Sequence, residues 1–176
     1  MKKLFALILA LALMLSAMPV FATETQVTEI NWSDVEVLAD MVEGEFVTLE
    51  NIGLKLWIPA DFKPMELTEE QAGVGMLAIY ATEGDTAAVS VQYVESNGLT
   101  MDEFINQMME NGGAEPEQVL INGLEGVGYD LPAQNTSCAV FQTESGNFVQ
   151  VMVAPVTADT DSTVLMMIIS SIQAAE

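Results

Sequence analysis

The chain has 176 residues, of which 26 are Asp or Glu and only 4 are basic, so its formal net charge is -22 at pH 7. Nucleic-acid affinity comes mainly from basic side chains that displace counterions from phosphates, so this charge excludes nucleic acid as a partner. The chain has no His, and its basic residues are all Lys. Imidazole acid–base catalysis, HExxH zinc chemistry and guanidinium recognition of phosphate are therefore excluded.

The first residues, "MKKLFALILALALMLSAMPVFATE", have the three parts of a secretory signal. Lys2 and Lys3 precede an apolar run, and a small-residue pattern ends at Ala22. We expect a signal peptide over 1–22, cleaved after Ala22, and a secreted or extracytoplasmic protein of bacterial type, with no stable membrane insertion after cleavage. The alternative is an uncleaved anchor, because the uncharged stretch approaches the ~20 residues that span a bilayer.

The remainder fits one domain. Residues 23–32 are polar and aperiodic, which predicts a flexible acidic leader, and residues 33–176 are predicted to form a single globular domain. Cys138 is the only cysteine, so no intramolecular disulfide can form. Stability must come from packing, and a chain of this length can bury a sufficient core.

Local patterns then predict the elements in chain order. Ser33 and Glu36 have the spacing of a capping box, which predicts a short helix that ends near Gly44. Alternating apolar residues predict two hairpins, with a helical turn at "TEEQ" between them. The predicted strands of these hairpins are "EFVTLE" (45–50), "LKLWIP" (54–59), "MLAIYAT" (76–82) and "AAVSVQYVE" (87–95).

The second half repeats this order. "LTMDEFINQMMENGG" (99–113) has apolar residues at helical spacing, a Thr100–Glu103 capping box and a glycine stop. Asn122-Gly123 between "QVLI" and "LEGVGYDL" is a strong hairpin signal. A fourth hairpin is predicted over "SCAVFQT" and "NFVQVMVAPV", and a closing helix over 159–173.

These elements predict an α+β fold with a mainly antiparallel sheet built from hairpins. Several strands, such as "CAVF" and "VQVMVAPV", are apolar on both faces, so both faces must be covered. We therefore expect an α/β/α sandwich, with helices flanking the sheet on both faces.

The element order and the strand that ends in "WIPADF" resemble the PsbP/Mog1/DcrB-like superfamily over residues 45–173. The resemblance implies binding or assembly without known catalysis, as in uncharacterised exported bacterial members. No functional residue is carried over, because none matches at the level of a motif.

The sequence predicts no catalytic, cofactor-binding or metal-binding residue. Cys138 lies in an apolar strand, which is typical of a buried, unreactive thiol. "DTDST" at 159–163 begins like a calcium loop but lacks the required Gly and Glu, so helix capping is the better interpretation. The methionine pairs at 108–109 and 166–167 are expected in the core.

One stretch offers a candidate contact patch. Lys55, Trp57 and Lys63 could form an aromatic plane between two cations, suited to an acidic or sugar ligand. The competing interpretation, which we favour, packs Trp57 beneath a helix while both lysines only offset nearby carboxylates.

The functional expectation is an exported, non-catalytic binding or accessory protein of unknown ligand, whose partner is a protein or an envelope component. The alternatives are a cation-associated structural protein of the cell envelope, with weak divalent-cation association, and a carboxylate-only hydrolase.

Overall fold

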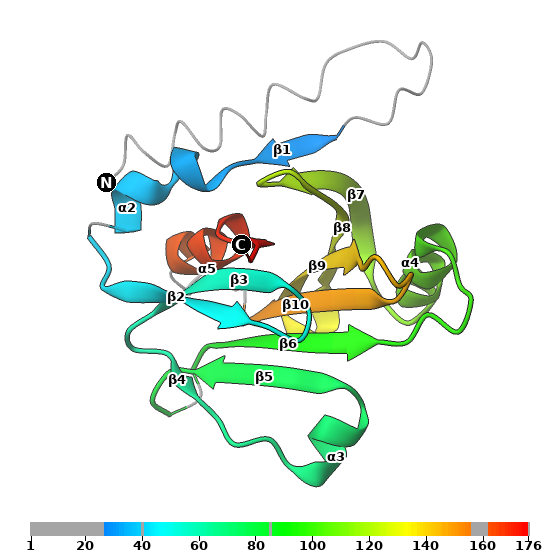
Figure 1. The fold of residues 1–176 in the computed structure, drawn as a ribbon, viewed down its shortest axis with the longest axis horizontal. Coiled ribbons are helices and arrows are strands. Elements are labelled where there is room, and N and C mark those ends of the chain that lie inside the picture. The colour runs from blue at the N-terminus through cyan, green and yellow to red at the C-terminus, as the bar shows by residue number, and fades with distance from the viewer. Residues whose placement is uncertain (1–26, 40, 85, 156–161, 176) are drawn as a thin grey trace.

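The computed structural model describes residues 27–39, 41–84, 86–155 and 162–175. The predicted signal peptide and the predicted capping residues at 159–161 lie outside these residues. Within them the chain forms an α+β fold of two sheets, four α-helices and two 3-10 turns (Figure 1). The predicted α+β class is confirmed. No helix within the described residues has the length and apolar character to cross a membrane.

The bounds of the elements agree with the predicted hairpins. The strands are β1 (Thr28–Ile30), β2 (Gly44–Leu49), β3 (Leu54–Pro59), β4 (Lys63–Pro64), β5 (Met76–Ala81), β6 (Ala88–Val94), β7 (Ala114–Ile121), β8 (Leu124–Leu131), β9 (Thr136–Gln142), β10 (Phe148–Ala154) and β11 (Gln173–Ala174). The helices are η1 (Trp32–Asp34), α2 (Glu36–Ala39), α3 (Glu69–Gly73), α4 (Met101–Glu110), η2 (Pro132–Gln134) and α5 (Ser162–Ser170).

The main sheet has eight strands in the order β1-β7-β8-β9-β10-β6-β5-β4. All its neighbours are antiparallel except β1 and β7, which are parallel. The predicted turn between β7 and β8 is confirmed, because Asn122 and Gly123 have φ angles of 47° and 84°, as a type I′ turn requires. Three of the four predicted hairpins build this sheet.

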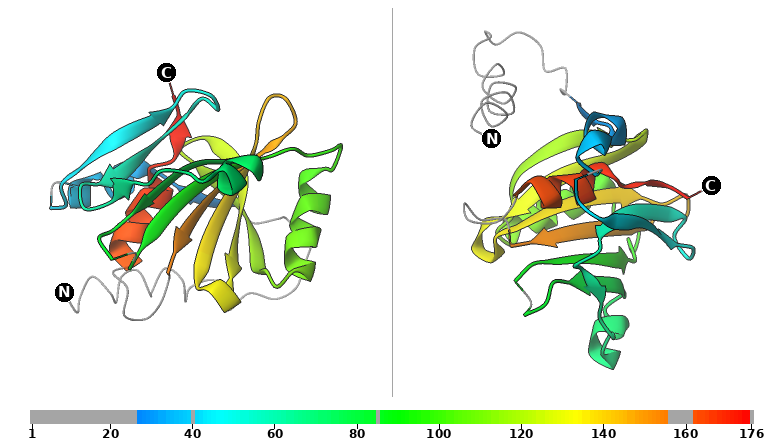
Figure 2. Two further views of the ribbon diagram at one scale, coloured as in Figure 1. Left: turned by 90° about the horizontal axis from the view of Figure 1, so that it is seen from below. Right: turned by 90° about the vertical axis from the view of Figure 1, so that its left-hand side faces the viewer.

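Each face of the main sheet carries a separate cluster of buried side chains. On β10, Val149 and Val151 belong to the cluster that also holds Leu165 of α5, whereas Phe148 belongs to the cluster that holds Phe104 of α4. Successive residues of a strand point to opposite faces, so the two clusters lie on opposite faces. The views in Figure 2 show α4 on one side of the sheet and α5 on the other.

The helix α4 follows its sequence signals closely. Thr100 accepts a hydrogen bond from the Glu103 amide, and Glu103 accepts one from the Thr100 amide, which completes the predicted capping box. These contacts satisfy two of the otherwise unpaired amides of the first turn. The buried residues Phe104 and Ile105 face the sheet.

The first predicted hairpin, β2–β3, does not join the main sheet. β2 and β3 pair with each other and with β11 in a second sheet of order β11-β3-β2, called the small sheet below. It covers the main sheet on the α5 side, and Leu54, Leu56 and Ile58 of β3 join the same cluster as α5. The predicted sandwich therefore lacked a second sheet, because the pattern of a hairpin does not say which sheet it enters.

The N-terminal segment also differs. Thr28–Ile30, inside the stretch predicted as a flexible leader, pair with Val119–Ile121 of β7. The single helix predicted from Ser33 is split into η1 and the four-residue α2, and η1 has no side-chain cap. The reason is tertiary: Trp32 packs on the small sheet, which fixes the chain at the point where the predicted helix would begin.

Asn122 connects the N-terminal segment to the C-terminal helix. Its Oδ1 accepts a hydrogen bond of 2.7 Å from the Trp32 amide, and its Nδ2 donates to the carbonyls of Ser170 and Ile172 at 2.7 and 2.8 Å. One turn side chain thus holds η1 and the end of α5 against the β7–β8 hairpin.

Candidate functional site

The outer face of the small sheet, which points away from the main sheet, carries an aromatic cluster. Trp32 lies with its ring centroid 5.4 Å from that of Phe46, in an edge-to-face arrangement, and 5.9 Å from that of Trp57. Phe46 and Trp57 are cross-strand partners, so both side chains lie on this face. These spacings are within the range of favourable ring contacts.

Trp57 is 4% exposed and offers no ring face to a ligand. Trp32 covers it from η1, and Gly44 lies against it from β2. A side chain at Gly44 would have its Cβ 2.4 Å from a carbon of the indole ring, so only glycine fits there. The interpretation favoured from the sequence packed Trp57 beneath a helix; in the structure Trp57 is buried, but it is covered by the side chain of Trp32 from a 3-10 turn.

The two lysines of the predicted patch lie in different sheets. Lys55 is half-buried on β3, and its Nζ lies 5.9 Å from the ring centroid of Phe46, within cation–π distance. Lys63 is on β4 of the main sheet, where its Nζ donates a hydrogen bond of 2.6 Å to the Ala60 carbonyl. The aromatic ring beside Lys55 that meets solvent is therefore Phe46, which the sequence analysis did not single out.

Among the described residues, the backbone of β2 has no partner along its outer edge. The amide of Trp57 donates to Ser171 Oγ at 2.7 Å, so it points away from β2 and the Trp57–Phe46 pair is not hydrogen-bonded. The Ala60 amide donates to the Glu43 carbonyl at 2.8 Å, so this pair is hydrogen-bonded and the next pair, Gly44 and Pro59, is not. Because antiparallel pairs alternate, the backbone groups of Gly44, Phe46 and Thr48 point outward.

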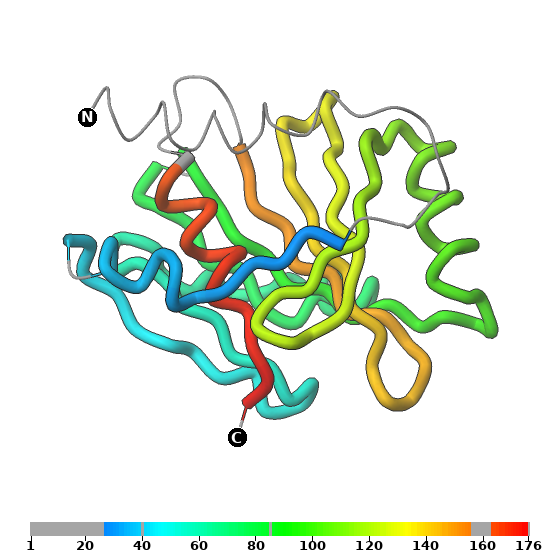
Figure 3. Tube along the Cα trace, turned by 90° about the horizontal axis from the view of Figure 1, so that it is seen from above, coloured from blue at the N-terminus to red at the C-terminus, as the bar shows by residue number. Residues whose placement is uncertain are grey.

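No other part of the described chain reaches these outward groups. β2 has β3 as its only strand neighbour among the described residues, and it lies at the periphery in Figures 2 and 3. Backbone amides and carbonyls need partners, and none of the described residues supplies one here. The outer edge of β2 is thus an open strand edge.

Exposed apolar side chains gather in the segment that leads into this edge. Val37, Met41 and Phe46 are 68%, 78% and 40% exposed, respectively. They account for three of the seven large exposed hydrophobic residues that the described chain carries. Such a concentration beside an open edge is typical of an interaction surface.

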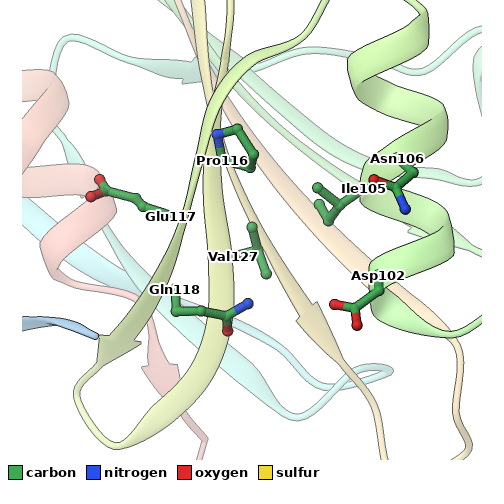
Figure 4. A pocket seen from close by; sticks show the side chains of 7 residues that line it. All are labelled: Asp102, Ile105, Asn106, Pro116, Glu117, Gln118 and Val127. Carbon is green, nitrogen blue, oxygen red and sulfur yellow. The ribbon is translucent and has the colours of Figure 1, made fainter. Parts of the chain in front are cut away.

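A second candidate is a pocket of about 460 Å³ between α4 and the β7–β8 hairpin (Figure 4). Its floor is apolar, with Ile105 and Val127, while Asp102 and Gln118 point toward each other across it. The full lining is Asp102, Ile105, Asn106, Pro116, Glu117, Gln118 and Val127. This volume is within the range of small-molecule sites, and four of the seven lining side chains are polar.

The two carboxylates of this pocket do not converge. Glu117 points away from Asp102 in Figure 4, and its Oε2 accepts a hydrogen bond of 3.3 Å from Thr28 Oγ1 on the side of β1. None of the lining residues is aromatic, so the pocket also lacks a platform for a sugar ring. An acid/base pair for glycoside hydrolysis requires two carboxyl groups that face the same bond, and this geometry does not supply it.

A further open pocket of about 700 Å³ adjoins Lys63, between β4 and the end of β5. Asp61 and Glu83 also line it. The Lys63 ammonium donates its hydrogen bond to the Ala60 carbonyl in its own loop. Within the described residues, the pocket therefore has no set of polar groups that point together toward one ligand.

Cys138 is buried on the α4 side together with two polar side chains. Gln150 Nε2 donates to Tyr129 Oη at 2.8 Å and lies 3.7 Å from Cys138 Sγ. Burial raises the pKa of the Cys138 thiol to about 11. Burial also raises the pKa of Tyr129, and the neighbouring Cys138 raises it further. The thiolate is the reactive form, so this cysteine has the properties of a core residue, as predicted.

The described residues contain no group of three or more Cys, Asp or Glu side chains placed to hold a metal ion. The two members of the methionine pair 166–167 differ in burial. Met167 is fully buried, whereas Met166 is exposed, contrary to the expectation that both lie in the core. α5 is only partly covered, since one side of the helix faces the core and the other faces solvent.

Comparisons with known proteins identify the fold. The sequence matches no protein-family profile and no curated protein. The structure is similar to the solution structure of the cyanobacterial PsbP (CyanoP) from Synechocystis, with a TM-score of 0.51 and 12% identity, over 74% of this chain and 92% of that one. It also matches the Ran-binding protein Mog1p of Saccharomyces cerevisiae, with a TM-score of 0.44 and 11% identity, over 77% and 97% of the chains.

The fold that the resemblance implied from the sequence is therefore confirmed: the chain has a PsbP-like fold. At 12% identity the likeness to PsbP shows the fold alone, and the weaker match to Mog1p carries no argument here. Function has to be argued from the surface of this chain.

Sequence reasoning missed Phe46 and the open edge of β2. The signal was partly present, because Phe46 and Thr48 alternate with Val47 in "EFVTLE". The sequence does not show that β2 is the edge strand of its sheet. That position depends on where α5 and β11 lie in the fold.

Proposed function

We propose that this protein is an exported, non-catalytic binding or accessory protein that contacts its partner through the outer face and open edge of the small sheet. The observation that carries this proposal is the exposure of Val37, Met41 and Phe46 in β2 and in the segment before it, where the outer backbone groups of β2 have no partner among the described residues. Apolar side chains and unpaired strand edges are features that soluble proteins usually cover.

The chemistry of the chain supports binding without catalysis. The only cysteine is buried with a raised pKa, and the two carboxylates at the α4 pocket point in different directions. The signal-like N-terminus supports export.

Site-directed photo-cross-linking in the native host tests the proposal. A photoreactive phenylalanine derivative in place of Phe46 should give one discrete cross-linked species in the exported fraction. The same derivative in place of Gln107, which is exposed on α4, is the matched control and should give none. Equal cross-linking from both positions, or none from either, would overturn the binding surface.

Intact mass tests the export part separately. The exported species should begin at Thr23, as the predicted cleavage after Ala22 requires. A full-length chain that stays inside the cell would overturn export while it leaves the binding surface intact.

A further inference from the structure

We infer that β2 accepts a basic, extended peptide segment as an additional strand of the small sheet. This inference rests on the proposed function, because it names the partner class for the same surface. It adds the mode of binding, strand addition, and the chemistry of the partner.

The geometry of β2 fits strand addition. The outward amides and carbonyls of Gly44, Phe46 and Thr48 recur at every second residue, about 7 Å apart, which is the repeat that a neighbouring strand presents. An extended peptide could satisfy all of them without disturbing the pairs that β2 makes with β3. Main-chain hydrogen bonds then supply affinity, and side chains supply specificity.

Other sheet edges in the described chain are much shorter. The main sheet ends in β1, with three residues, and β4, with two, and the opposite edge of the small sheet is the two-residue β11. Short edge strands limit unwanted pairing. β2 has six residues and is the longest strand at the end of either sheet.

The charge around β2 selects a basic partner. Glu36, Glu43, Glu45 and Glu50 are exposed on β2 or within the segments next to it, against one nearby cation, Lys55, whose Nζ lies 5.9 Å from the Phe46 ring centroid. Glu45 lies on the edge strand itself, where a Lys or Arg of an added strand would come within ion-pair reach.

A second copy of this chain fits this edge poorly. Pairing of two β2 strands would bring two sets of the same carboxylates together, on molecules that each carry a formal charge of -22. Like charges placed opposite each other across strands are destabilising. The partner should therefore carry Lys or Arg, together with an apolar side chain that can pack on Phe46.

The test uses a fluorescent decapeptide of alternating Lys and Val, and fluorescence anisotropy with the full chain. The key variant is Thr48→Pro, which removes an outward amide but no amide that pairs with β3, since proline is tolerated on the solvent side of an edge strand. Thr48→Val is the matched control, because it removes the hydroxyl and keeps the amide.

We expect the peptide to bind the parent and Thr48→Val equally, and Thr48→Pro roughly fivefold or more weakly, as the loss of one backbone hydrogen bond predicts. Glu45→Gln should weaken binding and reduce its salt dependence, and an alternating Glu/Val peptide should not bind. Equal binding by Thr48→Pro and Thr48→Val would overturn strand addition.

Two measurements keep the inference testable if Thr48→Pro does not fold. A Lys/Val peptide with every backbone nitrogen methylated keeps its charge but cannot donate backbone hydrogen bonds, so it should not bind the parent; equal binding would overturn the inference. Sedimentation of the parent should show a monomer. If it shows a dimer, and Glu45→Lys changes the amount of that dimer, then a second copy of the chain is the molecule that binds β2.

The outcomes separate this inference from the proposed function. If the peptide fails to bind but Phe46 still cross-links a discrete partner, strand addition is wrong and the binding function stands. If the peptide binds but Phe46 cross-links nothing in the native host, the edge is competent and the proposed function is wrong.

Discussion

The two sides of the main sheet are assembled in different ways. On the α4 side, the helix is capped by Thr100 and Glu103, three residues apart, and it packs on the hairpins that follow it. On the small-sheet side, contacts join segments that are 90 and 114 residues apart, through Asn122 and Ser171. The first side is encoded locally and buries its apolar surface. The second depends on distant anchors and leaves a strand edge open, which is where we place binding.

The largest expected effect concerns the α4 side. Phe104 is buried and its ring centroid lies 4.6 Å from that of Phe148, so Phe104→Ala should lower the free energy of unfolding by roughly 3 to 5 kcal/mol. Gln107→Ala, on the exposed face of α4, should change it by less than about 0.5 kcal/mol. Chemical denaturation measures both, and equal losses would mean that the helix does not dock through Phe104.

The next effect concerns the anchor of the small-sheet side. Asn122→Ala removes three side-chain hydrogen bonds and places alanine at a φ of 47°, so it should cost about 3 to 4 kcal/mol. Asn135 has a φ of 50° and is the matched control, because Asn135→Ala should cost only the backbone term of about 1 to 2 kcal/mol. Similar losses for both variants would show that the distant anchors contribute little.

A smaller effect is expected at the junction of β3 and α5. Ser171 Oγ accepts from the Trp57 amide and donates to the Ile168 carbonyl at 2.7 Å, and the residue is fully buried. Ser171→Ala leaves that amide without a partner, which should cost about 1 to 3 kcal/mol. Ser137→Ala, which loses only an exposed bond to Asp130, is the control. If urea denaturation gives the two variants the same stability, Ser171 does not hold the small sheet in place.

The smallest effect is a loss of stability in alkali on the α4 side. The pKa of Cys138 is raised from 9.0 to about 11 in the folded chain, so the unfolded chain loses this proton first as the pH rises. Stability should be fully present below pH 9 and fall between pH 9 and 11, by about 1 kcal/mol at pH 10. Thermal unfolding of the parent and of Cys138→Ala, compared over this range, measures the difference. A parallel pH dependence of the two proteins would contradict it.

The same contrast explains how much could be predicted from the sequence. The Thr100–Glu103 capping box and the Asn122-Gly123 turn were predicted because each lies within a few residues of the chain. The strand pattern also placed Lys55 and Trp57 on the face opposite the core of β3. That Trp32 covers Trp57 could not be predicted, because the position of Trp32 depends on the hydrogen bond from its amide to Asn122, 90 residues away.

The short strands β1, β4 and β11 were missed for a related reason. Two or three residues are too few to show an alternating pattern, and each of these strands is defined by its partner. The second sheet was missed because "EFVTLE" and "LKLWIP" have the pattern of a hairpin in any sheet. The open edge of β2 is a consequence of that second sheet, so it could not be found before the fold was known.

Amide hydrogen exchange of the free full-length protein, resolved residue by residue by NMR, tests the central claim most directly. The amides of Phe46 and Thr48 should exchange rapidly, whereas those of Glu45 and Val47, which pair with β3, should be protected, as should all those of the central strand β10. Alternating protection along β2 would show an open strand edge. Uniform protection of Glu45, Phe46, Val47 and Thr48 would show that the edge is already covered, and would contradict the account.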